Sequence, residues 1–168
     1  MADISRPLPT ALMMPGYVRG GQVISLVEIT GSIGDKIDIP KLADEMGADV
    51  SVLLPILDAA EMLGLVRVEK GDVKLTELGL KFQKTTKNKL TTLKDRIATI
   101  EPFRTALELA RGRSVTTAEV AEALGESGLK WHYQPEINES VIRTLLIHWS
   151  IYAGLLKYNG KTGRFQRA

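Results

Sequence analysis

The sequence predicts a mainly α-helical protein with short β-hairpins, an α+β fold made of two tandem winged-helix-like units. Three observations support this fold class. The segment VTTAEVAEALG (115–125) repeats the length and apolar pattern of IDIPKLADEMG (37–47). The segment ESVIRTLLIHWSIYAGLL (139–156) likewise matches SVLLPILDAAEMLGLV (51–66). A hairpin pattern follows each pair, and a repeated order of elements indicates the fold more strongly than a single copy does.

The composition is that of an ordinary globular protein. Of the 168 residues, 44% are hydrophobic and 25% are charged, which is enough for a core. The absence of cysteine excludes disulfides and thiolate metal sites. The start MADISRPLPT lacks a basic segment before a long apolar run, so we expect no signal peptide. No run of about 18 apolar residues occurs, and we therefore expect a cytoplasmic protein without membrane insertion.

The first unit is expected at residues 20–86, after an irregular lead-in at residues 1–19 that contains three prolines. From Gly21 onward, apolar residues recur every three or four positions, which predicts a helix. Gly31 and Gly34 favour the end of this helix, because glycine is the residue that most readily interrupts a helical pattern.

Two more helices follow in the first unit. Pro40 suits the first turn of the second helix, and Gly47 suits its C-terminal end. The third helix is expected from about Ser51 to Leu63. Pro55 lies within it and is tolerated only if the helix begins late, near Ser51.

A hairpin and a short helix end the first unit. The pattern LVRVEKGDVKLT (65–76) predicts two strands joined by a turn at Lys70-Gly71-Asp72. Thr76 is then expected to cap a helix over ELGLKFQKTT (77–86). The order helix, helix, turn, helix and hairpin is that of a winged helix.

The second unit is expected at residues 87–168. It should begin with one long helix over residues 89–110, kinked at Pro102. Thr117 is the candidate N-cap of the next helix, and Gly125 is its expected end.

The remainder of the second unit has a longer connection, the segment ESGLKWHYQPEIN (126–138), before its third helix. A second hairpin is expected around Asn159-Gly160 and Gly163. Apolar residues at matching positions of the two units should form the core. They are Leu57, Leu63, Leu65, Leu145, Trp149 and Leu156.

Two segments resemble a known family. The run LLPILDAAEMLGLVRVEKGDVKLTELGLKF (53–82) and the run WSIYAGLLKY (149–158) are similar to the AAA-associated C-terminal domain. That domain is commonly appended to ATPase subunits of nitrate/sulfonate/taurine-type ABC importers, and it also occurs as separate chains in archaea. The resemblance implies a regulatory or protein-interaction module without catalytic residues. The chain departs from the family at Ser150-Ile151, where a Gly-Arg pair is usual.

The sequence shows no arrangement for catalysis. The segment GSIGDK (31–36) lacks both the spacing and the following Ser or Thr of a phosphate-binding loop. His132 and His148 are the whole histidine inventory, too few for a catalytic zinc site, and His148 is expected to be a partly buried structural residue. We therefore expect no catalytic, cofactor-binding or metal-binding residues, and a protein that is not an enzyme.

DNA binding by a winged-helix transcriptional regulator is the alternative function. Residues 1–80 carry 7 Lys+Arg against 12 Asp+Glu (net −5), and residues 81–168 carry 15 against 8 (net +7). The third helix of the first unit, DVSVLLPILDAAEML (49–63), contains no Lys, Arg, Asn or Gln that would contact base edges. The second unit offers candidate nucleic-acid contacts at Arg143, Lys157, Lys161, Arg164 and Arg167.

Protein interaction is the favoured function. Trp131 and Tyr133 in the long connection are candidate contact residues, although packing of this aromatic cluster back onto the protein is the favoured interpretation. Trp149 and Tyr152, three residues apart in a helix, are expected in the core. The expected partner is an ABC transporter ATPase subunit, as the resemblance implies, or a second copy of the chain. DNA is the less favoured partner.

Overall fold

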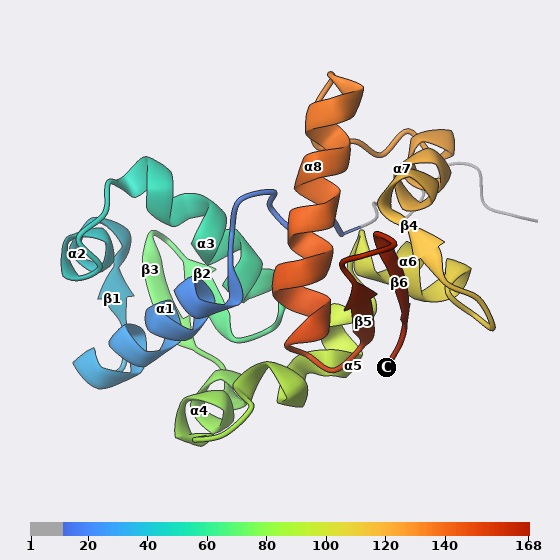
Figure 1. The fold of residues 1–168 in the computed structure, drawn as a ribbon. Coiled ribbons are helices and arrows are strands. Elements are labelled where there is room, and N and C mark those ends of the chain that lie inside the picture. The colour runs from blue at the N-terminus through green and yellow to red at the C-terminus, as the bar shows by residue number, and fades with distance from the viewer. Residues whose placement is uncertain (1–11) are drawn as a thin grey trace, which may run out of the picture.

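The computed structural model describes residues 12–168, and one order of elements occurs twice along the chain (Figure 1). This order is helix, short strand, helix, helix and two-stranded hairpin. The first half, residues 20–86, contains α1 (Gly20–Ile33), β1 (Ile37–Asp38), α2 (Ile39–Glu45), α3 (Val50–Met62), β2 (Val66–Glu69), β3 (Asp72–Leu75) and α4 (Glu77–Lys84). The second half, residues 87–168, contains the 3-10 helix η1 (Lys89–Leu93), α5 (Lys94–Ile97), α6 (Phe103–Leu109), β4 (Val115–Thr116), α7 (Thr117–Glu126), α8 (Pro135–Leu145), the π-helical turn η2 (Leu146–Ile151), β5 (Leu156–Asn159) and β6 (Arg164–Arg167). The predicted α+β class is confirmed.

Each half holds a small antiparallel sheet, and the strands of the two sheets follow the same order. The sheets run β1-β3-β2 and β4-β6-β5, so each hairpin adds a short strand that precedes it in sequence. Ile37 lies opposite Val73 in the first sheet, and Val115 lies opposite Phe165 in the second. All four side chains are buried, so each sheet turns one face toward the core.

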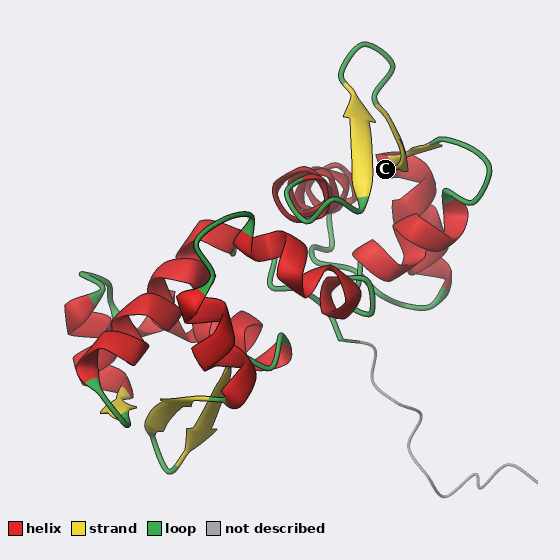
Figure 2. Ribbon diagram, turned by 90° about the horizontal axis from the view of Figure 1, so that it is seen from below, coloured by secondary structure: helices red, strands yellow, loops and turns green. Residues whose placement is uncertain are grey.

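The two hairpins differ in their loops and in where they lie. Lys70 and Gly71 form the first loop with φ values of 51° and 81°, the backbone that a two-residue primed turn requires. The second loop spans residues 160–163 and includes Gly163 at φ 69°. Figure 2 shows the β2–β3 hairpin at the lower edge of the view and the β5–β6 hairpin at the upper edge. The hairpins therefore belong to different sides of the molecule.

Polar side chains cap two helices of the first half as their sequence positions suggest. Asp38 accepts a hydrogen bond from the Lys41 amide at 2.8 Å and begins α2. Thr76 accepts one from the Gly79 amide at 3.0 Å and begins α4, as predicted. Each cap satisfies an amide that has no partner within its own helix.

The N-cap of α7 is Thr116, so the prediction of Thr117 is wrong by one residue. The Thr116 hydroxyl accepts from the Glu119 amide at 3.2 Å, and the Glu119 carboxylate accepts from the Thr116 amide at 3.2 Å. This reciprocal pair is a capping box, which fixes the first residue of the helix. The helix also continues past the predicted stop at Gly125 and ends at Glu126.

The single long helix predicted over residues 89–110 is wrong. The chain forms η1, α5 and α6 instead, with a break before Pro102. There the Glu101 amide donates to the Leu12 carbonyl at 2.7 Å, and the Met14 amide donates to the Glu101 carbonyl at 2.9 Å. These backbone groups bond to the lead-in, and Pro102 has no amide hydrogen to offer a helix interior. Four apolar residues of this segment are nevertheless buried: Leu93, Ile97, Ile100 and Phe103.

The core includes every residue predicted for it except one aromatic side chain. Buried are Leu57, Leu63, Leu65, Leu145, Trp149 and Leu156. Tyr152, expected to be buried with Trp149, is instead 65% exposed. Trp149 lies in η2 and Tyr152 directly follows it, so the residue that the π-helical turn adds rotates Tyr152 away from the phase of an α-helix.

The described part of the lead-in, residues 12–19, is irregular and packs against the second half (Figure 1). Met14 and Val18 are buried there. The Trp131 indole donates to the Met14 carbonyl at 2.7 Å, and the Trp149 indole donates to the Val18 carbonyl at 2.9 Å. Both tryptophans thus hold the backbone that leads into α1. The earlier part of the predicted lead-in, residues 1–11, lies outside the described residues.

A lysine joins the two halves where they meet. Lys89 at the start of η1 donates to the Glu28 carboxylate at 3.1 Å and to the Gln83 carbonyl at 3.2 Å. Its ammonium group also lies 5.3 Å from the centre of the Phe82 ring. Because these partners belong to α1 and α4, the contacts fix the second half against the helices of the first.

Candidate protein-interaction surface

Helix α3 exposes apolar and acidic side chains together. Leu53, Ile56 and Leu57 point into the core, at the spacing of one helical face. The other faces still carry apolar residues, and these are exposed: Val50, Val52 and Leu54. Asp58 and Glu61 add negative charge on the exposed side. A helix with solvent-facing apolar side chains is typical of a contact surface.

An apolar groove runs beside this helix and has a volume of about 770 Å³. We call it the α1–α3 groove. Its apolar lining comes from both halves of the chain, and the larger side chains are Ile24, Ile29, Met46, Val52, Ile56, Leu90 and Tyr152. Arg19, Glu45 and the half-buried His148 provide polar groups around these residues. The groove therefore combines a hydrophobic centre with a charged edge.

The α1–α3 groove continues into a smaller, acidic hollow of about 450 Å³. Ala48 and Val52 line both spaces. The hollow adds two exposed carboxylates, Asp44 and Asp49. Neither carboxylate forms an ion pair with any residue of 12–168. Their negative charge therefore faces solvent at one end of the groove.

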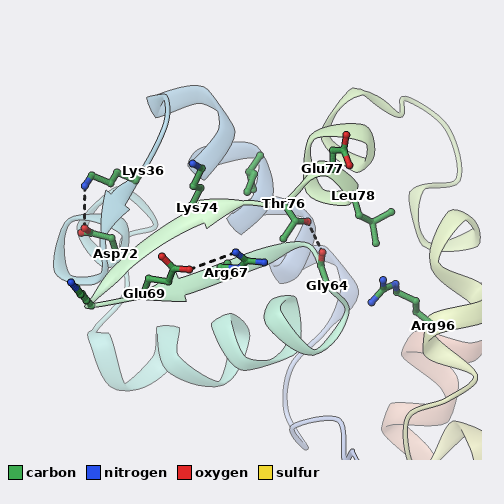
Figure 3. Close-up of a pocket in the computed structure, with 12 residues that line it drawn as sticks. Lys36, Gly64, Arg67, Glu69, Asp72, Lys74, Thr76, Glu77, Leu78 and Arg96 are labelled. Atoms are coloured by element: carbon green, nitrogen blue, oxygen red, sulfur yellow. Dashed lines mark hydrogen bonds and ion pairs between the residues drawn. The ribbon is translucent and has the colours of Figure 1, made fainter.

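A second cleft, of about 850 Å³, lies on the exposed side of the β2–β3 hairpin (Figure 3). Four of its eight charged side chains pair with one another, with Lys36 3.6 Å from Asp72 and Arg67 3.6 Å from Glu69. The Thr76 hydroxyl is engaged as well, because it donates to the Gly64 carbonyl and caps α4. The lining carries five basic and three acidic side chains, and its one hydroxyl group, that of Thr76, is already bonded within the protein.

Three of the five candidate nucleic-acid residues share a cleft of about 860 Å³ on the β5–β6 hairpin, and no acidic side chain lines it. They are Lys157, Lys161 and Arg164. Arg143 is exposed on α8 and does not line this cleft. Arg167 lies outside it too, and its guanidinium donates to the Leu107 carbonyl at 2.6 and 3.0 Å.

Arg164 is held by its own protein and is only partly available to a ligand. It donates to the Ser114 hydroxyl at 2.8 Å and lies 3.3 Å from the Glu119 carboxylate. Arg113 donates to the same carboxylate at 2.7 Å. This hydrogen bond, together with the one from the Thr116 amide, lowers the pKa of Glu119 below its ordinary value of about 4.5. Glu119 therefore stays ionised and ties β6 to α7.

The two aromatic candidates in the long connection have different surroundings. Trp131 is half-buried, and its indole is bonded to the lead-in. Its amide also donates to the buried Asn138 side chain at 2.7 Å, which holds the connection against α8. Tyr133 is 80% exposed and stacks on His132 with ring centres 4.6 Å apart. Of the pair, Tyr133 is the more exposed to solvent.

The α1–α3 groove was not among the features predicted from the sequence. One signal was available, because apolar residues surround the first two turns of α3 whereas a helix on the surface of a monomer needs only one apolar stripe. The described residues, 12–168, contain no group of three or more His, Asp or Glu placed to hold a metal ion. Among the same residues, no helix is long and apolar enough to cross a bilayer.

The chain is thus a small helix-rich α+β fold in which α3 exposes apolar and acidic side chains beside an apolar groove. Comparison with known families then identifies it: the family model described as the C-terminal AAA-associated domain matches residues 40–159, and the chain belongs to that family. The match includes both segments, 53–82 and 149–158, on which the resemblance was recognised. Membership supports an accessory-domain role. Comparison with curated proteins and with solved structures gives no match to this chain.

Proposed function

We propose that this protein is a non-catalytic regulatory module that acts by binding another protein, and that its partner is an ATPase subunit of an ABC importer in the cytoplasm. The family supports the accessory role and the partner class. In this proposal each half, residues 20–86 and residues 87–168, is a winged-helix-like unit used for protein contact. Trp131 serves mainly to anchor the lead-in, and Tyr133 remains a candidate contact residue.

One observation carries the proposal: the surface of α3. In a winged helix that binds DNA, this third helix enters the major groove and needs side chains that contact base edges. Here the exposed positions hold Val52, Leu54 and Asp58, with no Lys, Arg, Asn or Gln anywhere in the helix. Burial of apolar side chains against a protein would stabilise such a surface, whereas the negative charge would oppose phosphate.

DNA binding through the second half is a second candidate function, favoured by the cleft on the β5–β6 hairpin that lacks acidic residues. Lys157 and Lys161 are exposed there, and Arg143 is exposed on α8. Arg164 and Arg167, however, already bond to their own protein. The freely exposed positive charge is thus smaller than the sequence count suggests, and we favour the protein-interaction function.

The two functions can be separated with purified full-length protein. Calorimetric titration with an ABC importer ATPase subunit from the same organism should show binding, and the subunit's ATP hydrolysis rate should change when the complex forms. The protein alone should not hydrolyse ATP, and Lys36→Ala should make no difference to that result. Absence of binding to the ATPase subunit would contradict the proposed partner.

A gel-shift titration at near-physiological salt tests the DNA alternative. We expect weak binding that is indifferent to sequence and is reduced by the double variant Lys157→Ala/Lys161→Ala, since both lysines release counterions from phosphate. Binding to one promoter at least about a thousandfold tighter than to random duplex is the range of specific recognition. That result would overturn the protein-interaction function in favour of a transcriptional regulator.

A further inference from the structure

The repeat allows the third helices of the two halves to be compared residue by residue. In α3 the core positions are Leu53, Ile56 and Leu57. In α8 and η2 the same spacing is occupied by buried apolar residues, namely Ile142, Leu145 and Leu146. This alignment pairs Val52 with Val141. The preceding helices α2 and α7 align through their matched segments and pair Met46 with Leu124.

The paired residues differ sharply in exposure. Val52 is 51% exposed, whereas Val141 is 5% exposed. Met46 is likewise partly exposed, and Leu124 is buried. The same face of the bundle is therefore open in the first half and covered in the second. The open face is the α1–α3 groove, which both Val52 and Met46 line.

The cover in the second half is an irregular peptide segment of the same chain. A Cβ placed on Gly16 would lie 2.9 Å from Val141 Cγ1 and 3.4 Å from Trp131 Cδ1, so the lead-in backbone presses directly on this face. Trp131 then closes over the lead-in through its bond to Met14. One copy of the repeat thus shows what this face binds: an apolar backbone segment with an aromatic side chain beside it.

We propose that the α1–α3 groove is a docking site for an irregular, non-helical apolar segment of a partner protein that carries Lys or Arg at one end. The covered face of the second half, where the lead-in turns at Gly16, supplies the apolar and non-helical character of the occupant. Asp44 and Asp49 supply the charge preference, because neither is paired within residues 12–168 and both line the hollow at the groove's end. A basic group placed there gains attraction that salt screens. The proposal rests on the protein-interaction function.

The test uses the immobilised full-length chain and a phage-displayed library of random peptides of about 12 residues, which reach ~40 Å when extended. Enriched peptides should combine large apolar residues with Lys or Arg. Synthetic copies are then titrated by fluorescence anisotropy. Val52→Asp should weaken binding at least about tenfold. The matched control Leu80→Asp, at a similarly exposed apolar residue on α4 outside the groove, should bind as the unmodified protein does.

A second variant tests the charge without altering the apolar surface. Asp44→Asn/Asp49→Asn should weaken binding of the basic peptides and reduce its dependence on salt. The fold should tolerate it, because Asp49 makes no side-chain capping bond to α3. Asp95→Asn, at an exposed acid on α5, is the control. Val52→Asp could destabilise the protein more than Leu80→Asp in thermal unfolding. In that case, peptide binding by the Asp44→Asn/Asp49→Asn variant decides whether the groove is the docking site.

Three results would overturn the docking site: no enriched peptide, enriched peptides without basic residues, or equal binding to Val52→Asp and Leu80→Asp. Its failure is distinct from failure of the proposed function. An ATPase subunit that binds Val52→Asp normally would keep the function and exclude the groove. Basic apolar peptides that bind the groove, with no binding of the ATPase subunit, would keep the groove and exclude that partner.

Discussion

The first and second halves of this molecule use the same order of elements and the same strand order, yet they end with different surfaces. In the first half, α1 is 14 residues long and covers much of α3, but it leaves Val52 and Met46 at the surface. In the second half, α6 has only seven residues, and the lead-in supplies the missing cover. Segments outside the repeat therefore decide whether this face is open or closed.

The largest expected effect comes from removing a tryptophan that holds the lead-in. Trp149 is fully buried, and its indole donates to the Val18 carbonyl. Trp149→Ala should lower the free energy of unfolding by about 3–5 kcal/mol, measured by urea denaturation. Trp149→Phe keeps a ring but leaves the Val18 carbonyl without its donor, and it should cost about 1–3 kcal/mol. Equal losses for the two variants would mean that packing by the ring is unimportant.

A leucine from each half tests whether the two cores are equivalent. Leu57 and Leu145 are both buried, so Leu57→Ala and Leu145→Ala should each cost about 2–5 kcal/mol. Because the halves share one continuous core, both variants should unfold in a single transition when followed by circular dichroism. A loss below about 0.5 kcal/mol at both sites is far outside the cost of a buried leucine and would contradict the assigned helix faces.

Two glycine-to-alanine substitutions, one in the lead-in and one in α1, should change the stability less and test how each half is covered. Gly16 presses on Val141, so Gly16→Ala should destabilise the protein by about 1–3 kcal/mol through a forced shift of the lead-in. Gly21 in α1 has no atom within 4 Å of an added Cβ, and Gly21→Ala should be neutral or stabilise by up to about 1 kcal/mol. Thermal unfolding of both variants measures the difference. A stabilising Gly16→Ala would contradict the close approach that covers the second half.

The smallest expected effect concerns Glu119 in the second half, which forms ion pairs with Arg113 and Arg164. Its pKa is lowered by the bond to Arg113, so its stabilising contribution is present above its ordinary pKa of about 4.5 and is lost as the pH falls through the lowered value. Glu119→Gln should cost about 0.5–1 kcal/mol at neutral pH, as exposed ion pairs do. The stabilities of the two proteins should converge on acidification. A constant difference from pH 7 to pH 3 would argue against this role.

The sequence predicted most of the framework because its signals were local. The matched segments 37–47 and 115–125, the cap at Thr76 and the Lys70-Gly71 turn all depend on neighbouring residues, and the structure contains each of them. Helical periodicity reports which residues face inward, so the core leucines were also predicted.

The failures arose where distant contacts or an irregular turn prevailed. The break before Pro102 depends on backbone bonds to Leu12 and Met14, which no local pattern reveals. Exposure of Tyr152 follows from the π-helical turn, which shifts the helical phase by one residue. The α1–α3 groove escaped because its exposure depends on which segments cover the bundle. The candidate residues Trp131 and Tyr133 were identified, but their different surroundings required the structure.

The bonds between the tryptophans and the lead-in also order the events of folding. Trp131 is 117 residues from Met14 in the sequence, and Trp149 is 131 residues from Val18. During synthesis at about 5–20 residues per second, the apolar side chains of Met14 and Val18 stay uncovered until Trp131 and Trp149 have been made. The closure of so long a loop slows folding relative to helical proteins with local contacts. The first half can therefore fold before the second half, whose core is complete only when residues 12–19 pack against it.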